Sequence, residues 1–376
     1  MRHRALKGII VGARRKAFSG RVTFSSVIES VEAAPGGADY IIPGLIDLQV
    51  NGAETFDVME ARVEDLVSLA RVMAQKGTTS FLPTAITAPL DDLVRVHEAV
   101  ATAAQEVEQA SGYATILGMH LEGPFIAQSR LGVHPPHTLT PSKEALETVL
   151  GLSLLRVLTL APELEGALDA IGLLVERSVV VSMGHSDATL DQAMAGVEAG
   201  ARMFTHLFNA MRPIHHREPG IAGAGLLASE AYAALIADGV HVHPAMLRLA
   251  LHARGSDGII LTSDSVALKS FDPKARANCW GAGRDAVAEG CAARRPTGQL
   301  AGSLSFLIDC VRVMIETAGA TIEQAVSMAS TNPARLLGLK DRGVIKKGAR
   351  ADLLVLDRHL KLKAVFVAGQ ELTHQS

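Results

Sequence analysis

Residues 46–52 read IDLQVNG and follow the turn Pro43-Gly44; they belong to the first of eight short apolar runs that decide the fold. A polar turn and a segment with helical periodicity follow these runs through the middle of the chain. Strands that alternate with helices form a parallel sheet, and eight such units predict a closed α/β barrel of the (β/α)8 TIM type. We place the strands at residues 45–49, 79–83, 115–120, 156–160, 178–182, 202–205, 233–237 and 259–261, and helices at 63–76, 90–109, 164–177 and 189–199.

The two ends of the chain have a different pattern. Residues 1–42 read as short β-like pieces broken by glycine, and two further strands are expected at 352–356 and 364–367. Each terminal piece is too small for a core of its own. We therefore expect both ends to combine in one small β-sandwich domain.

The expected domain boundaries follow from this division. The small β-domain would consist of residues 1–42 and 344–376, and the barrel would cover residues 43–343. Helices at 303–318 and 322–330 would close the barrel section.

Composition argues against several classes of protein. Apolar residues make up 48% of the 376, enough for a large core, and the 4% share of aromatic residues suits close-packed α/β architecture. A net charge of −3 without a basic stripe argues against a nucleic-acid partner. No run approaches the roughly 18 apolar residues of a membrane span, and residues 1–20 do not resemble a signal peptide. The cysteines Cys279, Cys291 and Cys310 lack C-x-x-C spacing, which favours a reducing, cytoplasmic setting.

Polar residues with catalytic potential follow five of the expected strands. The active sites of such barrels lie where the strands end, on the loops that come next. The strands end, in chain order, in His120-Leu121-Glu122, in Gly184-His185, in Thr205-His206, in Asp238-Gly239-Val240-His241 and in Ser263-Asp264.

Glu122, His185 and His206 form a candidate metal site. One carboxylate and two imidazoles make a tripod for Zn2+ or Fe2+ with an open coordination position, which is typical of catalytic rather than structural metal sites. Any one such histidine is more often an ordinary buried polar residue, but three ligands at functional strand ends favour a metal centre. Asp264 is placed to act as general base and then as general acid. Its ordinary role would be a helix N-cap, which the catalytic role does not exclude.

The end of the first strand raises a question about this metal site. Many metal-dependent hydrolases carry His-x-His at this place, and here the two positions are Gln49 and Asn51. Neither amide is a good ligand for a transition metal. Either the chain is not such a hydrolase, or it has lost half of the metal site.

A set of motifs answers the question. The segments HLEGPF, GHSDAT, THLFNAM, REPG, DGVHV, TSDS and LAGS, with TNPAR near the end, resemble the N-acetylglucosamine-6-phosphate deacetylases of the amidohydrolase superfamily from Pro43 to about Asp357. This resemblance implies a (β/α)8 barrel with a small β-domain built from both termini. It also implies a single divalent metal, because one-metal members carry Gln and Asn at the first strand. Zn2+ is the expected ion, with Fe2+, Co2+ or Mn2+ as alternatives.

The resemblance further implies roles for individual residues. His134 would polarise the acetamide carbonyl and stabilise the developing oxyanion; Arg217 would bind the phosphate with its guanidinium fork. A homodimer is implied, in which Arg217 reaches the partner's active site. The full set of implied substrate-binding residues is Gln49, Val133, His134, Asn209, Ala210, Arg217, Asp238, His241, Leu300, Ala301 and Gly302.

The predicted activity is hydrolysis of N-acetyl-D-glucosamine 6-phosphate to D-glucosamine 6-phosphate and acetate, in amino sugar catabolism. The galacto epimer of the substrate is an alternative, as are another N-acyl deacylase and a non-catalytic barrel used as a binding scaffold. The sequence departs from the family at Asp264, which is followed by serine where the family more often has alanine, and over residues 269–295.

Overall fold

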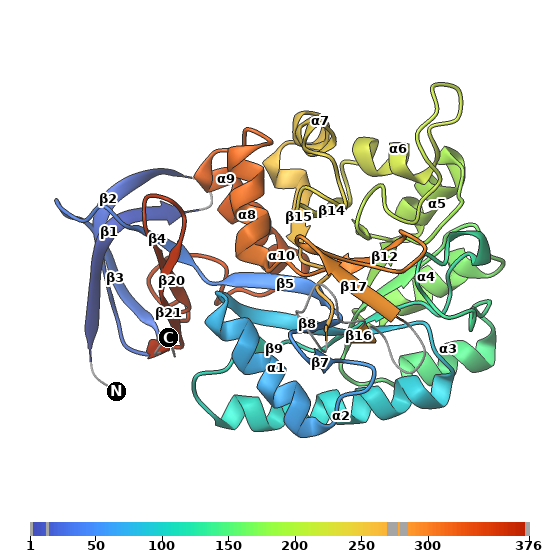
Figure 1. The fold of residues 1–376 in the computed structure, drawn as a ribbon, viewed down its shortest axis with the longest axis horizontal. Helices are drawn as coiled ribbons and strands as arrows, with labels where there is room; N and C mark the ends of the chain where they lie inside the picture. Colours follow the sequence, from blue (N-terminus) through green and yellow to red (C-terminus); the bar gives the residue numbers. More distant parts are fainter. Residues whose placement is uncertain (1–2, 13–14, 269–276, 279–284, 373–376) are drawn as a thin grey trace.

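The structure is a computed structural model that describes residues 3–12, 15–268, 277–278 and 285–372. A barrel of parallel strands with surrounding helices lies beside a smaller sheet that contains both ends of the chain (Figure 1). Within the described ranges, no helix combines the length and apolar character needed to cross a membrane.

Eight parallel strands form the barrel and lie side by side in chain order. Every expected strand is present, with shifts of a few residues at the ends. The expected third strand, 115–120, is divided at Gly118, whose φ is +133°. The strands are β5 (Leu45–Val50), β8 (Thr78–Ile86), β9 (Thr115–Ile116) with β10 (Met119–Glu122), β11 (Leu155–Leu160), β12 (Val180–Met183), β13 (Met203–Phe204), β14 (Tyr232–Ile236) and β15 (Ile259–Thr262).

Helices on the outside of the barrel connect these strands. Helix α2 illustrates why they form, because its buried residues Leu93, Val96, Val100, Ala103 and Val107 recur every three or four positions and make one apolar face. The helices are α1 (Val63–Gln75), α2 (Leu90–Gln109), α3 (Lys143–Leu150), α4 (Ala167–Glu176), α5 (Leu190–Ala199), α6 (Gly220–Leu227), α7 (Pro244–Arg254), α8 (Leu307–Glu316), α9 (Ile322–Ala329) and α10 (Thr331–Leu336). Short elements are β6 (Gly52–Ala53), β7 (Phe56–Asp57) and the 3-10 turns Gln128–Arg130 and Ser256–Gly258.

The ring closes between β5 and β15. The two strands contact each other, but the backbone hydrogen bonds that join them among the described residues are made just beyond the end of β15. The backbone N–H of Asp264 donates to the carbonyl of Gln49 over 3.1 Å, and the N–H of Asn51 donates to the carbonyl of Ser265 over 2.9 Å. The closing seam therefore coincides with the turn that carries Asp264.

Apolar side chains fill part of the ring interior. One buried cluster takes residues from six of the eight strands, and side chains from so many strands can meet only inside the ring. The cluster contains Ile46, Leu48, Leu82, Val157, Met203, Ala234 and Ile260, and it packs against Ala334 of α10 and Leu337. This packed layer supports the polar residues that follow the strands.

The small β-domain combines both ends of the chain, as expected. Its seven strands form one continuous sheet in the order β22-β21-β20-β4-β1-β2-β3, not two separate sheets. The sheet folds back on itself, because the rings of Phe24 on β2 and Phe366 on β21 lie 5.3 Å apart although three strands separate them in the order. The strands are β1 (Arg4–Gly12), β2 (Arg15–Phe24), β3 (Ile28–Ala33), β4 (Tyr40–Pro43), β20 (Leu353–Leu356), β21 (Leu362–Val367) and β22 (Gln370–Leu372).

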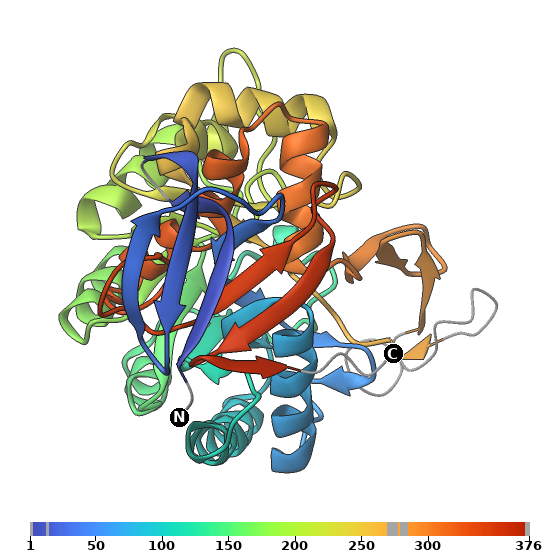
Figure 2. The same cartoon turned by 90° about the vertical axis from the view of Figure 1, so that its left-hand side faces the viewer.

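An additional four-stranded sheet lies between β15 and α8. It consists of β16 (Ala277–Asn278), β17 (Asp285–Glu289), β18 (Ala292–Arg294) and β19 (Leu300–Ser303), and β17–β19 stand out at one side of the barrel (Figure 2). Residues 269–276 and 279–284 of the divergent segment, with its tryptophan among them, lie outside the described residues. The helix expected to begin at 303 begins at Leu307, because Ser303 ends β19 and Asp309 accepts a hydrogen bond from the N–H of Phe306.

Candidate active site

A pocket of about 500 Å3 lies where the barrel strands end. Glu122, His185, His206 and Asp264 contribute to its wall, as do eight of the residues expected to bind substrate. Those eight are Val133, His134, Asn209, Ala210, His241, Leu300, Ala301 and Gly302. The pocket therefore brings together the strand ends on which the sequence prediction rested.

Glu122, His185 and His206 converge inside this pocket. Oε1 of Glu122 lies 3.0 Å from Nε2 of His185 and 2.9 Å from Nε2 of His206, and the two Nε2 atoms are 3.1 Å apart. All three residues are buried, and among the described residues they form a group able to hold a metal ion. Both histidines have positive φ, +47° and +31°, which is uncommon outside glycine and typical of functional sites.

The chemistry of these donors fits a cation. Nδ1 of His185 donates to the carbonyl of Arg130 over 2.8 Å, which leaves Nε2 as the ring nitrogen that faces Glu122 and His206. Lone pairs that face one another across about 3 Å repel unless a proton or a metal lies between them. One carboxylate oxygen and two imidazole nitrogens are donors that suit Zn2+ and similar ions.

The three side chains are also electrostatically coupled. Burial raises the pKa of Glu122, but hydrogen bonds with His134, His185 and His206 outweigh burial and hold the pKa well below its usual range. Burial lowers the pKa of His206, but its hydrogen bond and attraction to Glu122 reverse this and leave the pKa raised. The carboxylate is therefore ionised at neutral pH and available as a ligand.

Asp264 lies on the turn at the closing seam. Its φ is +49°, and its Oδ1 accepts a hydrogen bond of 2.7 Å from Nδ2 of Asn51. Burial, reinforced by the negative charge of Glu122, raises the pKa of Asp264. A carboxylate with a raised pKa is a better proton acceptor, as a general base requires.

The first-strand amides lie beside this carboxylate. Both Gln49 and Asn51 are 1% exposed. Nε2 of Gln49 and Oδ1 of Asn51 have no hydrogen-bond partner within the described part of the chain. Asn51 is a direct partner of Asp264, a role that sequence reasoning missed, and Gln49 does not line the pocket.

His134 lies next to the candidate metal site. Its Nε2 is 3.7 Å from Oε2 of Glu122, and its Nδ1 lies 2.9 Å from the hydroxyl of Thr87. Burial is the main cause that lowers the pKa of His134 to about 4, so the ring is neutral at pH 7. If Thr87 donates its proton to Nδ1, the neutral ring carries its own proton on Nε2 and can donate it to a substrate oxygen.

Asp238 and His241 form a second hydrogen-bonded pair. Oδ2 of Asp238 accepts from Nδ1 of His241 over 2.6 Å and from the hydroxyl of Ser303 over 3.0 Å. Burial opposes ionisation of Asp238, but the hydrogen bond and charge of His241 outweigh it and lower the pKa. His241 lines the pocket and Asp238 does not, so Asp238 orients the histidine from behind.

His120 shows the ordinary role of a buried histidine. Its ring nitrogens lie 2.8 Å from the carbonyl of Leu48 and 2.8 Å from the hydroxyl of Thr159. Burial lowers the pKa of His120 to about 4. With both nitrogens satisfied, this ring is not available as a metal ligand.

Arg217 lies outside the pocket of its own chain. It is exposed on the loop that precedes α6 and projects from the barrel (Figure 1), and its Nη1 lies 2.8 Å from Nε2 of His216. The described pocket wall contains other arginines instead, Arg130 and Arg294. The guanidinium of Arg130 binds Asp187 over 2.6 Å.

The additional sheet contacts the His134 loop. Arg295 donates to the carbonyl of Val133 over 3.0 Å, and Gln299 donates to the carbonyl of Gly132 over 2.8 Å. In β19, Gly302 has φ +122°, and a Cβ at this position would lie 2.2 Å from Val266. Only glycine fits there, which permits the close approach of β19 to Val266, just after the turn that carries Asp264. No local sequence signal marks the contacts of Arg295 and Gln299 with the His134 loop, because these contacts depend on where the sheet lies.

Asp47 is a further buried acid that sequence reasoning missed. It is fully buried, and burial is the main cause that raises its pKa to about 6. Its only sequence signal is a charged residue inside an apolar strand, two positions before Gln49.

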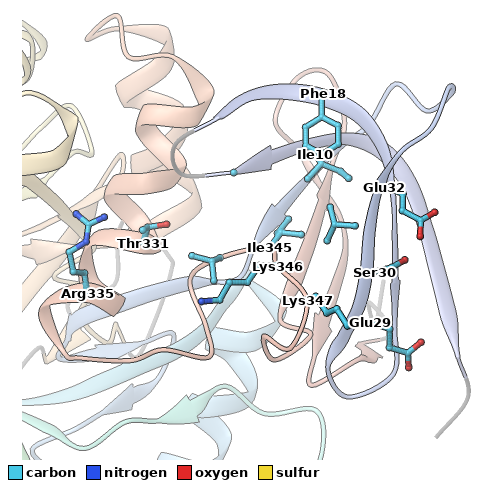
Figure 3. Close-up of a pocket in the computed structure, with 13 residues that line it drawn as sticks. Ile10, Phe18, Glu29, Ser30, Glu32, Thr331, Arg335, Ile345, Lys346 and Lys347 are labelled. Atoms are coloured by element: carbon cyan, nitrogen blue, oxygen red, sulfur yellow. The ribbon is translucent and has the colours of Figure 1, made fainter.

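A larger cavity of about 780 Å3 lies at a distance from this chemistry, against the small β-domain (Figure 3). Apolar side chains such as Ile10, Phe18 and Ile345 share its wall with Arg335 and Lys346. It contains no histidine or cysteine. The smaller pocket at the strand ends is therefore the candidate active site.

Comparison with known proteins agrees with this assignment. The amidohydrolase family matches residues 40–372. An N-acetylglucosamine-6-phosphate deacetylase of Lysinibacillus sphaericus is 35% identical over 345 residues, or 91% of this chain and 88% of the relative. An N-acetylgalactosamine-6-phosphate deacetylase of Escherichia coli O157:H7 is 37% identical over 353 residues, or 92% of each chain.

Solved structures extend the likeness to three dimensions. An N-acetyl-D-glucosamine-6-phosphate deacetylase from Mycobacterium smegmatis, in complex with N-acetyl-D-glucosamine-6-phosphate, is 32% identical with a TM-score of 0.90 and 99% coverage of both chains. An N-acetylglucosamine-6-phosphate deacetylase from Thermotoga maritima is 30% identical with a TM-score of 0.89, covering 98% of this chain and 99% of the other. The chain therefore belongs to the amidohydrolase family, in the branch that contains the N-acetylglucosamine-6-phosphate deacetylases.

Proposed function

We propose that the chain hydrolyses N-acetyl-D-glucosamine 6-phosphate to D-glucosamine 6-phosphate and acetate, in amino sugar catabolism. The observation that carries the proposal is the meeting of Glu122, His185 and His206 with Asp264 in one pocket. A ligand set beside a carboxylate with a raised pKa is the equipment that metal-assisted amide hydrolysis requires.

The side chains of the pocket have distinct tasks in this reaction. One divalent metal held by Glu122, His185 and His206 would polarise a water molecule and the acetamide carbonyl. Asp264 accepts the proton that the water loses and transfers it to the departing amine. His134, neutral at pH 7, donates from Nε2 to the carbonyl oxygen as negative charge develops there.

Binding of the sugar phosphate involves other residues of the pocket wall. Asn209, Ala210 and His241 contact the phosphate and sugar, and β19 closes over the substrate through Leu300, Ala301 and Gly302. The protein forms a homodimer, and Arg217 of each subunit acts in the active site of the partner subunit. Its exposure on a projecting loop, outside its own pocket, supports this assignment.

The metal and the cellular setting are further parts of the proposal. Zn2+ is the expected ion, with Fe2+, Co2+ or Mn2+ as alternatives, because site geometry and metal availability rather than raw affinity decide which ion such a site holds. Cytoplasmic placement is supported by Cys291 and Cys310, which are free thiols in the described part of the chain.

Acetate release tests the proposal. Metal-loaded protein should release acetate from N-acetylglucosamine 6-phosphate, and much more slowly from unphosphorylated N-acetylglucosamine. The galacto 6-phosphate is the second candidate substrate, because the N-acetylgalactosamine-6-phosphate deacetylase of Escherichia coli O157:H7 is as similar to the chain as the N-acetylglucosamine-6-phosphate deacetylase of Lysinibacillus sphaericus. A higher kcat/KM for the galacto epimer would select that alternative, and no acetate from either phosphate would refute both.

A further inference from the structure

The turn that carries Asp264 contacts β5 and the residue just after it at three alternate positions. At one position Asn51 donates to the carboxylate of Asp264, and at the second the carbonyl of Gln49 accepts from the N–H of Asp264. At the third position lies Asp47, which contacts the two residues before Asp264, Thr262 and Ser263.

Asp47 binds the end of β15 with both carboxylate oxygens. Oδ1 accepts from the hydroxyl of Thr262 over 2.9 Å and from the N–H of Ser263 over 3.3 Å, and Oδ2 lies 3.3 Å from the same N–H. Oδ1 also accepts from the N–H of Gln49 over 3.2 Å. One buried carboxylate therefore joins the end of β15 to β5, two strands that share no ladder pairing within the described ranges.

The backbone of the turn needs such support. Asp264 has φ +49°, a conformation that costs free energy for a non-glycine residue and persists only where the surroundings impose it. The position of Asp264 depends on the two residues that enter the turn, Thr262 and Ser263. Asp47 holds both of them without touching the pocket.

We propose that Asp47 is a positioning residue for the catalytic Asp264: its carboxylate holds Thr262 and Ser263 so that the Asp264 side chain points to the substrate. This inference rests on the proposed function, since it concerns the rate of proton transfer by Asp264. Asparagine in place of Asp47 keeps the size of the side chain and one acceptor oxygen, but its NH2 group replaces Oδ2 and cannot accept from the N–H of Ser263.

The test is a double-mutant cycle on acetate release from N-acetylglucosamine 6-phosphate. Asp47→Asn should lower kcat by about 10- to 100-fold, with KM within about twofold and normal metal content, because small displacements of a catalytic group have effects of this size. In the Asp264→Asn background the same substitution should change the residual kcat by less than about twofold, because residues that act as a unit are not additive. Thr262→Val removes the hydroxyl donor from the other side of the contact and should show the same non-additivity.

Asp352→Asn is the matched control. Asp352 is also a buried carboxylate, but it binds Nε of Arg350 and the N–H of Ala368 near the small β-domain. Its substitution should leave kcat unchanged.

Each other outcome decides against the inference. Unchanged kcat in Asp47→Asn, or an equal fall in the wild-type and Asp264→Asn backgrounds, would show that Asp47 does not act through Asp264. Wild-type protein without deacetylase activity would refute the proposed function and the inference with it. Wild-type activity combined with additive losses would refute the positioning role alone.

Discussion

Asp47 also leads to a prediction about stability, because a negative charge is expensive to bury. Its pKa in the folded protein is about 6, against 3.8 for an ordinary aspartate, and burial is the largest cause. Each pKa unit corresponds to about 1.4 kcal/mol, so the ionised group costs the fold about 3 kcal/mol relative to its protonated form. Asp47→Asn replaces the carboxylate with a neutral group of the same shape.

The sign follows from the direction of the shift. Between pH 4 and pH 6 the folded wild type binds a proton at Asp47 that the unfolded chain has already lost, so the wild type loses stability as pH rises. The variant lacks this titration. The free energy of unfolding of Asp47→Asn minus that of the wild type should therefore increase by about 2.5 kcal/mol between pH 4 and pH 8.

Urea unfolding at a series of pH values, followed by circular dichroism at constant metal concentration, measures this difference. Other groups titrate equally in both proteins and cancel from it. Asp352→Asn should instead lose stability, because it leaves the guanidinium of Arg350 without its 3.0 Å ion pair. If the difference in free energy of unfolding between Asp47→Asn and the wild type does not change with pH, the reasoning about the buried charge is refuted.

Further outcomes are expected at the pocket and at its proposed dimer contact. Elemental analysis should find about one tightly bound divalent metal per chain, and removal of this metal by a chelator should abolish acetate release. A requirement for two metal ions per chain to reach the full rate would contradict the single site. Asp264→Asn should retain the metal while kcat falls by roughly 100-fold or more, and near-normal turnover would remove Asp264 from the mechanism. Arg217→Ala should mainly raise KM. Arg217→Ala and Asp264→Asn chains can also be co-folded in equal amounts. If Arg217 acts in trans, each mixed dimer has one site with both defects and one with neither, so roughly a quarter of all sites should be wild type. Activity equal to the average of the two parent variants, in confirmed mixed dimers, would place Arg217 in cis.

The candidate metal site and the barrel could be predicted from the sequence for a common reason. Parallel strands end at one edge of the ring, so Glu122, His185 and His206 needed no tertiary information to be brought together. The apolar runs that identify the strands are local signals, and each lies within a few residues of an observed strand. The motifs added the substrate class, which strand order alone does not contain.

Other parts of the site depend on contacts that no local pattern encodes. Asp47 contacts Thr262, 215 residues further along the chain, and nothing around either residue signals the pair. Thr87 orients His134 from a different loop, 47 residues away. The additional sheet was missed because β17 and β18 are short and alternate poorly, and their role becomes visible only where Arg295 and Gln299 reach the His134 loop.

The seam between β5 and β15 has a consequence for how the enzyme is made. Asn51 and Asp264 lie 213 residues apart, so a ribosome that adds about 5 to 20 residues per second needs about 10 to 40 s to synthesise the second after the first. During that interval the newly made β5 has one edge without a neighbour, and the nascent chain does not yet contain Asp264, the proposed general base. Activity should therefore appear in a single late step of biogenesis, when the ring closes, and partly synthesised or truncated chains that stop before β15 should be inactive even if they already hold metal.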